Sequence, residues 1–327
     1  MGSKFRQIGV LASCALLSAC ASAVRQESAP VFVPTPVTIV AIGDMPYRPK
    51  DIAPFEALLG EINAIGPDLT IHVGDIKGGG SPCTDALFEE QRDYMDSVAG
   101  PLVYTPGDNE WTDCHRKSAG GYDPQERLSV LRKLFFSTDK SRGEKPMTVV
   151  RQADIDPDYP VLVENVRWQM NGVSFVTAHI VGSNNGLNSD VPGARDEYVA
   201  RDAANGKWIR DSFAVARSEV AAAVVLAFQA DPFLTFGIGG GFRNTLAAIS
   251  DGVERFEGPV LVIMGDGHVY TIDTPFHDRQ GRIRENVVRL SVPGAADIRA
   301  VRIRIDPEAP QMFTFETFGL GNADQRG

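Results

Sequence analysis

The sequence predicts an α/β fold, because β-branched runs of strand length alternate with segments of helical periodicity along its first third. Val37–Ile42 is a continuous apolar run, which is typical of a strand buried on both faces. Residues 51–65 then place apolar side chains at helical spacing and stop before Gly66 and Pro67. Because a further strand follows at residues 69–73, the three segments predict a β-α-β unit.

Further helices and strands continue this pattern along the chain. Helices are expected at residues 85–99 and 203–220. Strands are expected at residues 102–105, 173–178, 224–228 and 259–264, and alternating apolar residues at 287–305 predict closing antiparallel strands. The glycine-rich stretch at 237–241 lacks the spacing of a dinucleotide-binding motif and is interpreted as a flexible loop.

Residues 37–306 are expected to form one domain, followed by a C-terminal strand and tail at residues 307–327. The 327 residues are 43% hydrophobic and 23% charged, which is typical of a globular protein with a sizeable core. The net charge of -10 argues against nucleic-acid binding by a basic surface. An anionic substrate would therefore need local positive charge, for example from metal ions.

The N-terminus predicts export. Two basic residues precede an apolar run at residues 8–17, which is too short to span a bilayer and has the character of a signal-peptide core. The Leu-Ser-Ala-Cys sequence at residues 17–20 resembles the bacterial lipobox, which implies cleavage before Cys20 and a lipid on its thiol. Residues 1–19 would then be a lipoprotein signal peptide and the proline-rich residues 20–36 a tether. An ordinary signal peptide cut nearby is the alternative; the expected location is periplasmic, or anchored to the outer membrane of a bacterium.

Four of the predicted strands end in the same dipeptide, Gly-Asp. The acids are Asp44, Asp75, Asp108 and Asp266, and His268 follows the last of them. A single Gly-Asp is an ordinary turn signal. In an open α/β sheet, however, ligands bind outside the carboxyl ends of the strands, so four acids in this register are expected to converge. Glycine before each acid allows a sharp turn and leaves room beside the carboxylate.

Clustered carboxylates repel one another, which is unfavourable unless cations hold them together. Asp and His side chains in combination favour Mn, Fe or Zn over calcium. The sequence therefore predicts a divalent metal site at the strand ends.

The blocks around these acids resemble the calcineurin-like metallophosphoesterase superfamily, whose pattern is D-x-H, G-D, G-N-H-[D/E], a lone His and G-H-x-H. The corresponding blocks here are Gly43-Asp-Met-Pro46, Gly74-Asp75, Gly107-Asp-Asn-Glu110 and Gly265-Asp-Gly-His268. The resemblance covers residues 38–305 and implies a layered α/β sandwich, with two mixed β-sheets flanked by helices. It also implies two divalent metal ions at the strand ends and a phosphate ester as the substrate.

The resemblance assigns the metal ligands as follows. Asp44 and His268 would hold the first ion. Asp75 would bridge the two ions, and Asp108 and Asp266 would hold the second.

Three positions depart from the family pattern. Pro46 stands where the family has a metal-binding His. Asn109, next to Asp108 in the catalytic block, stands where a family His assists departure of the leaving group, and an amide cannot donate that proton. The lone His has two counterparts, His179 and Gln229, and both are candidate metal ligands.

Two cysteines belong to the leader, which leaves Cys83 and Cys114. They follow Asp75 and Asp108, so they are expected to lie close together if the two preceding strands are neighbours. Because a disulfide persists in exported proteins, the sequence predicts one between them.

The function that follows is hydrolysis of a phosphate ester by a metal-activated water, in a protein held at a membrane by its lipid anchor. The alternative is a degenerate, non-catalytic relative that serves as a binding or envelope-associated protein. Pro46 and Asn109 favour the alternative, whereas the four Gly-Asp strand ends oppose it.

Near these blocks, His72 is expected to be a core histidine, and Trp111 either a lid over the site or a core residue.

Overall fold

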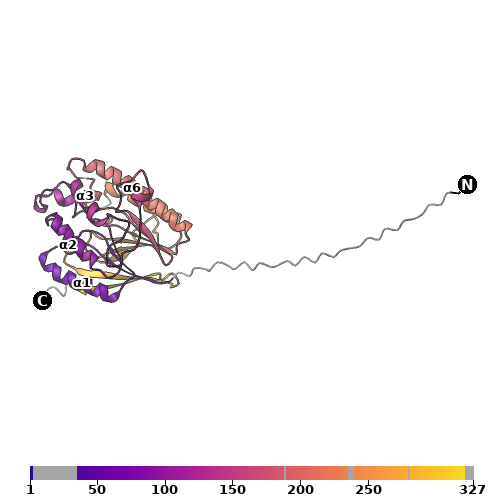
Figure 1. The fold of residues 1–327 in the computed structure, drawn as a ribbon, viewed down its shortest axis with the longest axis horizontal. Helices are drawn as coiled ribbons and strands as arrows, with labels where there is room; N and C mark the ends of the chain where they lie inside the picture. The colour runs from indigo at the N-terminus through magenta and orange to yellow at the C-terminus, as the bar shows by residue number, and fades with distance from the viewer. Residues whose placement is uncertain (3–34, 188, 235–238, 279, 321–327) are drawn as a thin grey trace. The chain divides into compact units, whose positions relative to one another are not determined.

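Two β-sheets pack face to face, and helices cover the outer face of each sheet (Figure 1). The computed structural model describes residues 1–2, 35–187, 189–234, 239–278 and 280–320. The chain divides into two units, Met1–Val33 and Pro34–Gly327, and both sheets belong to the second. Cys20 and the rest of the predicted lipobox lie outside the described residues.

The five-stranded sheet has the order β12-β11-β1-β2-β3. Its centre is parallel, with β1 (Val37–Ile42) beside β2 (Leu69–His72) and β2 beside β3 (Leu102–Tyr104). β11 (Ile298–Ile305) runs antiparallel to β1, and β12 (Phe313–Leu320) forms the edge, antiparallel to β11. The three parallel strands therefore end at one edge of the sheet, as the β-α-β pattern predicts.

The seven-stranded sheet has the order β4-β5-β6-β7-β8-β10-β9. Its central strands β6, β7, β8 and β10 are parallel, whereas β4, β5 and β9 pair antiparallel with their neighbours. The strands are β4 (Val150–Arg151), β5 (Val166–Met170), β6 (Val173–Thr177), β7 (Ala223–Ala227), β8 (Val260–Met264), β9 (Thr271–Asp273) and β10 (Val287–Ser291).

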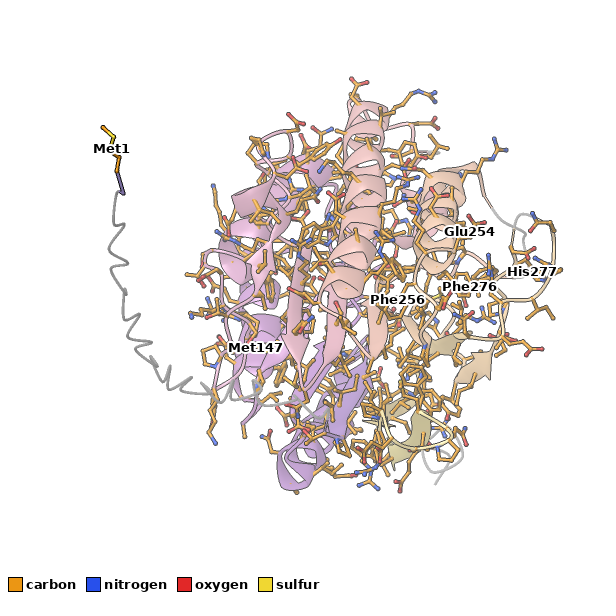
Figure 2. The ribbon with its side chains drawn as sticks, turned by 90° about the vertical axis from the view of Figure 1, so that its right-hand side faces the viewer. Met1, Met147, Glu254, Phe256, Phe276 and His277 are labelled. Atoms are coloured by element: carbon orange, nitrogen blue, oxygen red, sulfur yellow. A yellow bond between two sulfur atoms is a disulfide. The ribbon has the colours of Figure 1, made fainter. Side chains whose placement is uncertain are left out.

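Helices from different parts of the chain cover the two sheets. α1 (Ile52–Ile65), α2 (Asp85–Asp96) and α3 (Pro124–Phe135) pack on the five-stranded sheet. α6 (Ala194–Ser218) and α7 (Arg243–Val253) lie side by side over the seven-stranded sheet (Figure 2). The short helices and 3₁₀ turns are α4 (Gln152–Ile155), α5 (Gly182–Asn185), η1 (Pro49–Asp51), η2 (Thr112–His115), η3 (Lys117–Ala119) and η4 (Gly240–Phe242).

Local sequence explains where several helices begin and end. The Thr84 side chain caps α2 by accepting a hydrogen bond from the Leu87 N–H. The Asp123 carboxylate caps α3, whose first residue is Pro124. α1 ends at Gly66, which adopts a left-handed conformation with a φ of 60°.

Within the described residues, no helix combines the length and the apolar character needed to cross a bilayer.

An apolar core shared by both sheets lies between them. Ile39, Ile71 and Val103 of the five-stranded sheet are buried in one cluster with Phe175 and Val225 of the seven-stranded sheet. Each buried side chain of this size contributes about 1.5–3 kcal/mol relative to an exposed one. This apolar interface fixes the sheets against each other, which in turn sets where their strand ends meet.

The predicted α/β fold with two mixed sheets is confirmed, with differences in detail. The strands at residues 287–305 do not form an antiparallel pair, because β10 is parallel to β8 in one sheet and β11 is antiparallel to β1 in the other. Alternating apolar residues show that a strand has two distinct faces, but not which strand it pairs with. α6 begins at Ala194, earlier than the expected helix at residues 203–220, and α3 and α7 were not expected.

A disulfide joins Cys83 and Cys114, whose Cα atoms lie 5.8 Å apart. Cys83 lies between β2 and α2, and Cys114 lies in η2 after β3. The disulfide therefore connects the loops that follow two neighbouring strands, and it joins the pair expected from the sequence.

Removal of this disulfide should lower the free energy of unfolding by about 3–4 kcal/mol, because it closes a long loop in the unfolded chain. Urea denaturation of the Cys83→Ser/Cys114→Ser variant beside the wild type measures the difference. Thiol titration of the unreduced, denatured domain should find neither cysteine free, and two free thiols would contradict the pairing.

Candidate metal centre

The carboxyl ends of the two sheets bring four aspartates together. Asp44, Asp75 and Asp108 follow the neighbouring strands β1, β2 and β3, and Asp266 follows β8 of the other sheet. Two hydrogen bonds connect the loops: the Asp44 N–H donates to the Gly74 carbonyl and the Asp266 N–H donates to Asp44 Oδ1, both at 2.9 Å. The second of these bonds joins the two sheets directly beside the acids.

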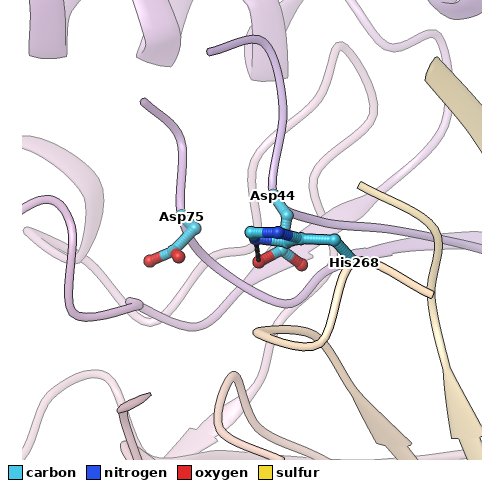
Figure 3. A group of neighbouring side chains, drawn as sticks. All are labelled: Asp44, Asp75 and His268. Atoms are coloured by element: carbon cyan, nitrogen blue, oxygen red, sulfur yellow. Dashed lines mark ion pairs between the residues drawn. The ribbon is translucent and has the colours of Figure 1, made fainter. Parts of the chain in front are cut away.

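The acids form two groups that share Asp75. One ligand atom each of Asp44, Asp75 and His268 lie within 4.8 Å of one another, and so do those of Asp75, Asp108 and Asp266. Figure 3 shows the first group, in which the His268 ring lies against the Asp44 carboxylate with Nε2 3.3 Å from Oδ1. Asp75 thus lies between the two groups, where the family resemblance places the bridging ligand.

The donor atoms of these groups fit divalent ions. Both groups offer carboxylate oxygens and the first adds an imidazole nitrogen, a combination that Mn, Fe and Zn accept. Asp44 Oδ2 is buried and has no hydrogen-bond partner among the described residues, so its lone pairs remain open to a cation. Each group could therefore hold a divalent ion, and Asp75 belongs to both groups.

Four of these residues have a left-handed backbone. The φ angles are 57° for Asp44, 55° for Asp75, 62° for Asp266 and 56° for His268. Asp tolerates this region better than most residues, yet each such conformation still costs about 1–3 kcal/mol. Strain of this kind clusters at functional sites, because the surrounding structure must hold it in place.

Glycine is required where the loops approach the acids most closely. A Cβ atom on Gly107 would lie 2.1 Å from Asp75 Oδ1, and one on Gly265 would lie 2.4 Å from Asp44 Oδ2. Both distances are far below van der Waals contact, so any larger residue would displace a carboxylate. The Gly-Asp pattern therefore leaves room beside the carboxylates, although the glycine of one block makes room for the acid of another.

Burial makes ionisation of these acids unfavourable. It raises the pKa of Asp75 well above its usual range, and neighbouring carboxylates raise it further. Burial and then the charge of Asp108 raise the pKa of Asp266 to about 7. Burial also raises the pKa of Asp44, against the hydrogen bond and charge of His268. Because Asp44, Asp75 and Asp266 are desolvated together, a bound cation would favour their ionised forms.

Neighbouring side chains hold Asp75 in position. The Asn109 N–H donates to Asp75 Oδ1 (3.1 Å), and Asn109 Nδ2 donates to Asp75 Oδ2 (2.9 Å). The buried Glu110 Oε1 accepts from the N–H of Asp75 (3.1 Å), the N–H of Gly107 (2.7 Å) and the Tyr104 hydroxyl (2.8 Å). Asn109 therefore orients the shared carboxylate, and Glu110 joins the loops that follow β2 and β3.

Two further side chains enter the centre that the sequence analysis did not single out. The Ser183 hydroxyl donates to Asp108 Oδ2 (2.6 Å), and the Tyr47 hydroxyl donates to Asp75 Oδ2 (3.0 Å). Burial and then the charge of Asp75 raise the pKa of Tyr47 well above its usual range, so without a cation its hydroxyl is a neutral donor. The available sequence signals were the polar loop that contains Ser183 and the place of Tyr47 immediately after Pro46.

Of the two candidates for the lone histidine, His179 belongs to neither group. His179 is buried, with Nδ1 2.8 Å from Glu164 Oε1. Gln229 Oε1 accepts from the Gly182 N–H (2.6 Å), and a Cβ atom on Gly182 would lie 2.8 Å from Asp266 Oδ1. Gln229 therefore contacts Gly182, and Gly182 lies beside Asp266 of the second group. Metal coordination by His179 or Gln229 stays a prediction.

His72 and Trp111 are core residues. Burial lowers the pKa of His72 to about 4, and its neutral Nδ1 accepts from the Gly74 N–H (3.2 Å). Trp111 is 2% exposed, and its ring packs against that of His179 with centroids 5.3 Å apart. Of the two roles open for Trp111, the structure favours core packing over a lid.

The metal-free protein should lose stability as the pH rises from about 4 to 7. The pKa of Asp266 is raised from its usual value near 4 to about 7, so the folded state binds more protons than the unfolded state in this window. Thermal unfolding with chelator should therefore give a higher Tm at pH 5 than at pH 8, and added Mn²⁺ should reduce the difference. Asp266→Asn should weaken this pH dependence; a Tm that rises from pH 5 to pH 8 in chelator would contradict it.

Comparison with solved structures finds distant similarity. GAP50, the anchor in the inner membrane complex of Plasmodium, is 9% identical over 88% of this chain and 90% of its own, with a TM-score of 0.48. A novel phosphatase from Mycoplasma pneumoniae is 9% identical over 88% and 95%, with a TM-score of 0.42. Vps29 complexed with Zn²⁺ from Entamoeba histolytica is 10% identical over 86% and 98%, with a TM-score of 0.24. These scores are too low to support a conclusion about fold or activity.

A family model carries the assignment instead. No curated protein sequence matches the chain significantly. The model of the calcineurin-like phosphoesterases matches residues 37–270, a region that contains all four aspartates and His268. The chain therefore belongs to the calcineurin-like phosphoesterase family.

Proposed function

We propose that this protein is an exported, metal-dependent phosphoesterase. The observation that carries the proposal is the pair of ligand groups that share Asp75, in a chain of the calcineurin-like phosphoesterase family. Asp44, Asp75 and His268 would hold one ion, and Asp75 would share the other with Asp108 and Asp266. When bound, two divalent ions stabilise charge on the phosphoryl oxygens and lower the pKa of the attacking water to about 7.

The surrounding residues support this role by holding the acids in place. Asn109 donates to both carboxylate oxygens of Asp75, which leaves that side chain little freedom to rotate. The Ser183 hydroxyl donates to Asp108 Oδ2. The chain therefore provides a pre-organised set of donors, and such a set binds cations without first being reordered.

A cavity of about 540 Å³ supplies room for the substrate beside the second group. Its wall includes Ser183, which contacts Asp108, and Arg116, whose Nη1 lies 2.5 Å from Asp113 Oδ2. A phosphoryl group near the acids would place its ester substituent in this cavity. Arg116, paired with Asp113, places a positive charge on that wall, which would favour an anionic part of the substrate.

Asn109 restricts the leaving group. It stands where the family has a leaving-group histidine, and its Nδ2 donates to Asp75 Oδ2 (2.9 Å) and to the Lys77 carbonyl (3.0 Å). An amide does not release a proton at neutral pH. The alkoxide must therefore leave unprotonated or take its proton from water, which favours esters of acidic alcohols.

The second candidate function is that of a non-catalytic binding or envelope-associated protein. Pro46 favours it, because a proline side chain has no donor atom to replace the family's metal-binding His. Asn109 favours it as well, because an amide cannot supply a proton to the leaving group. The retention of carboxylates at four strand ends, and the absence of a hydrogen-bond partner for Asp44 Oδ2 among the described residues, favour metal binding instead.

The wild type should hydrolyse aryl phosphates about 10²–10⁴-fold faster than alkyl phosphates, because general acid assistance of this size is missing. Steady-state kcat/KM on p-nitrophenyl phosphate and on an alkyl phosphate, with Mn²⁺ present, measures the ratio. Asn109→His should raise the alkyl rate selectively. Asp75→Asn should abolish both activities and the bound metal, whereas Asp139→Asn, at an exposed position, should change neither.

Two results would count against this mechanism. Equal turnover of aryl and alkyl esters by the wild type would show that another residue supplies the proton. No turnover of either ester, with no bound metal after reconstitution, would favour the binding-protein function.

Export and lipid anchoring remain part of the proposal, supported by the lipobox-like sequence and by the disulfide. The wild type, expressed in a bacterium, should partition with the membrane fraction, and Cys20→Ser should shift it to the soluble fraction. Cell fractionation and intact mass measure both effects. An unchanged partition of Cys20→Ser would rule out the lipid anchor.

A further inference from the structure

The turn that carries Ser183 has an unusual backbone. Its residues Ser183, Asn184 and Asn185 are all left-handed, with φ angles of 53°, 56° and 58°. Asn adopts this conformation more readily than most residues, but residues other than glycine normally do so singly rather than in a run. Contacts from outside the turn must therefore hold it in this shape.

This turn lies directly against the second group, which consists of Asp75, Asp108 and Asp266. The Ser183 hydroxyl donates to Asp108 Oδ2 (2.6 Å). A Cβ atom on Gly182 would lie 2.8 Å from Asp266 Oδ1 and 3.0 Å from Asp108 Oδ2, so the backbone of the turn approaches both carboxylates closely. Because hydrogen-bonded partners orient the side chains that bind a metal ion, the shape of this turn affects where Asp108 points.

Arg201 of α6 makes several hydrogen bonds to this turn, and its side chain is 1% exposed. Its Nη2 donates to the Asn185 carbonyl (2.9 Å), and its Nη1 donates to Asn185 Oδ1 (2.5 Å) and to the His179 carbonyl (3.1 Å). Asn185 Nδ2 in turn donates to the Gly241 carbonyl (3.1 Å). The guanidinium therefore joins the left-handed turn to the segment that follows β6.

Two further contacts fix the Arg201 guanidinium itself. Glu197, one turn earlier in α6, accepts from Nε at 2.8 Å and from Nη2 at 3.1 Å. The guanidinium also lies over the Trp111 ring, 5.2 Å from its centroid, and the Trp111 N–H donates to the Asp108 carbonyl (3.3 Å). Arg201 therefore contacts both the turn that carries Ser183 and the loop that carries Asp108.

We propose that Arg201 is a positioning residue for the second ion. It acts through other residues: it holds the left-handed turn at Asn185, and the turn places the Ser183 hydroxyl against Asp108. Lysine does not replace it, because an ammonium lacks the planar, forked donors that reach several acceptors at once. This assignment rests on the proposed function, because it requires that the second group binds a metal ion.

The test measures Mn²⁺ binding by calorimetry in the wild type, Arg201→Lys, Ser183→Ala and the double variant. Asp266→Asn removes a ligand of the second group only, so it identifies which equivalent of metal belongs to that group. Each single variant should weaken this equivalent about 10–100-fold, as loss of an outer partner of a ligand does, and leave the first unchanged. The double variant should bind no more weakly than the weaker single variant, because both changes act through the same hydrogen bond.

Arg210→Lys is the matched control. Arg210 lies on the same helix, and its Nε donates to Asp251 Oδ2 (2.9 Å), a carboxylate of α7 rather than of the metal centre. This variant should leave both equivalents unchanged. Asn185→Gly tests the same connection without altering Arg201, because glycine keeps the left-handed backbone and removes the side chain that Arg201 binds. It should also weaken the second equivalent, so the assignment is tested even if Arg201→Lys does not fold.

The outcomes separate this assignment from the proposed function. An unchanged second equivalent in folded Arg201→Lys or Asn185→Gly would overturn the assignment alone. So would losses from Arg201→Lys and Ser183→Ala that multiply in the double variant. Equal weakening of both equivalents would also overturn it, because Arg201 would then only stabilise the fold. No metal bound by the wild type would overturn both the assignment and the proposed function.

Discussion

The mutual repulsion of carboxylates at the junction of the two sheets is the constraint on which the site depends. Asp44, Asp75, Asp108 and Asp266 are brought together by strands that the apolar core fixes in position. Removing ionised carboxylates from water is costly, and placing them side by side adds to that cost. The core therefore holds together carboxylates that would move apart if the loops were free. A bound cation is the simplest way to offset their repulsion.

The loops around the centre show how this arrangement is maintained. Left-handed conformations at Asp44, Asp75 and Asp266 are held by hydrogen bonds between loops, such as the one from the Asp266 N–H to Asp44 Oδ1. Glu110 accepts hydrogen bonds from two strand-end loops, and the disulfide joins the same two loops further along the chain. Strain at the acids is thus balanced by a rigid surround, which is how functional sites keep unfavourable local geometry.

The departures from the family pattern alter the chemistry more than the architecture. Asn109 keeps its place at the centre but uses its amide to orient Asp75 rather than to deliver a proton. Gln229 gives its carboxamide oxygen to the Gly182 N–H, next to Asp266. The four carboxylates are therefore present together, while amides stand at two positions where the resemblance places an imidazole.

Sequence alone determined the parts of this protein that follow from local pattern. Periodicity located β1, α1 and β2. The Gly-Asp strand ends located Asp44, Asp75 and Asp108 at one edge of a sheet, because neighbouring parallel strands end there, whereas packing of the two sheets brings Asp266 to them. Only the tertiary structure decided the partner of β10, the group joined by the Tyr47 hydroxyl and the burial of His179 away from both groups. The reason is physical: a strand's end is fixed by its own residues, whereas strand pairing and the direction of a loop side chain depend on packing against segments far away in the chain.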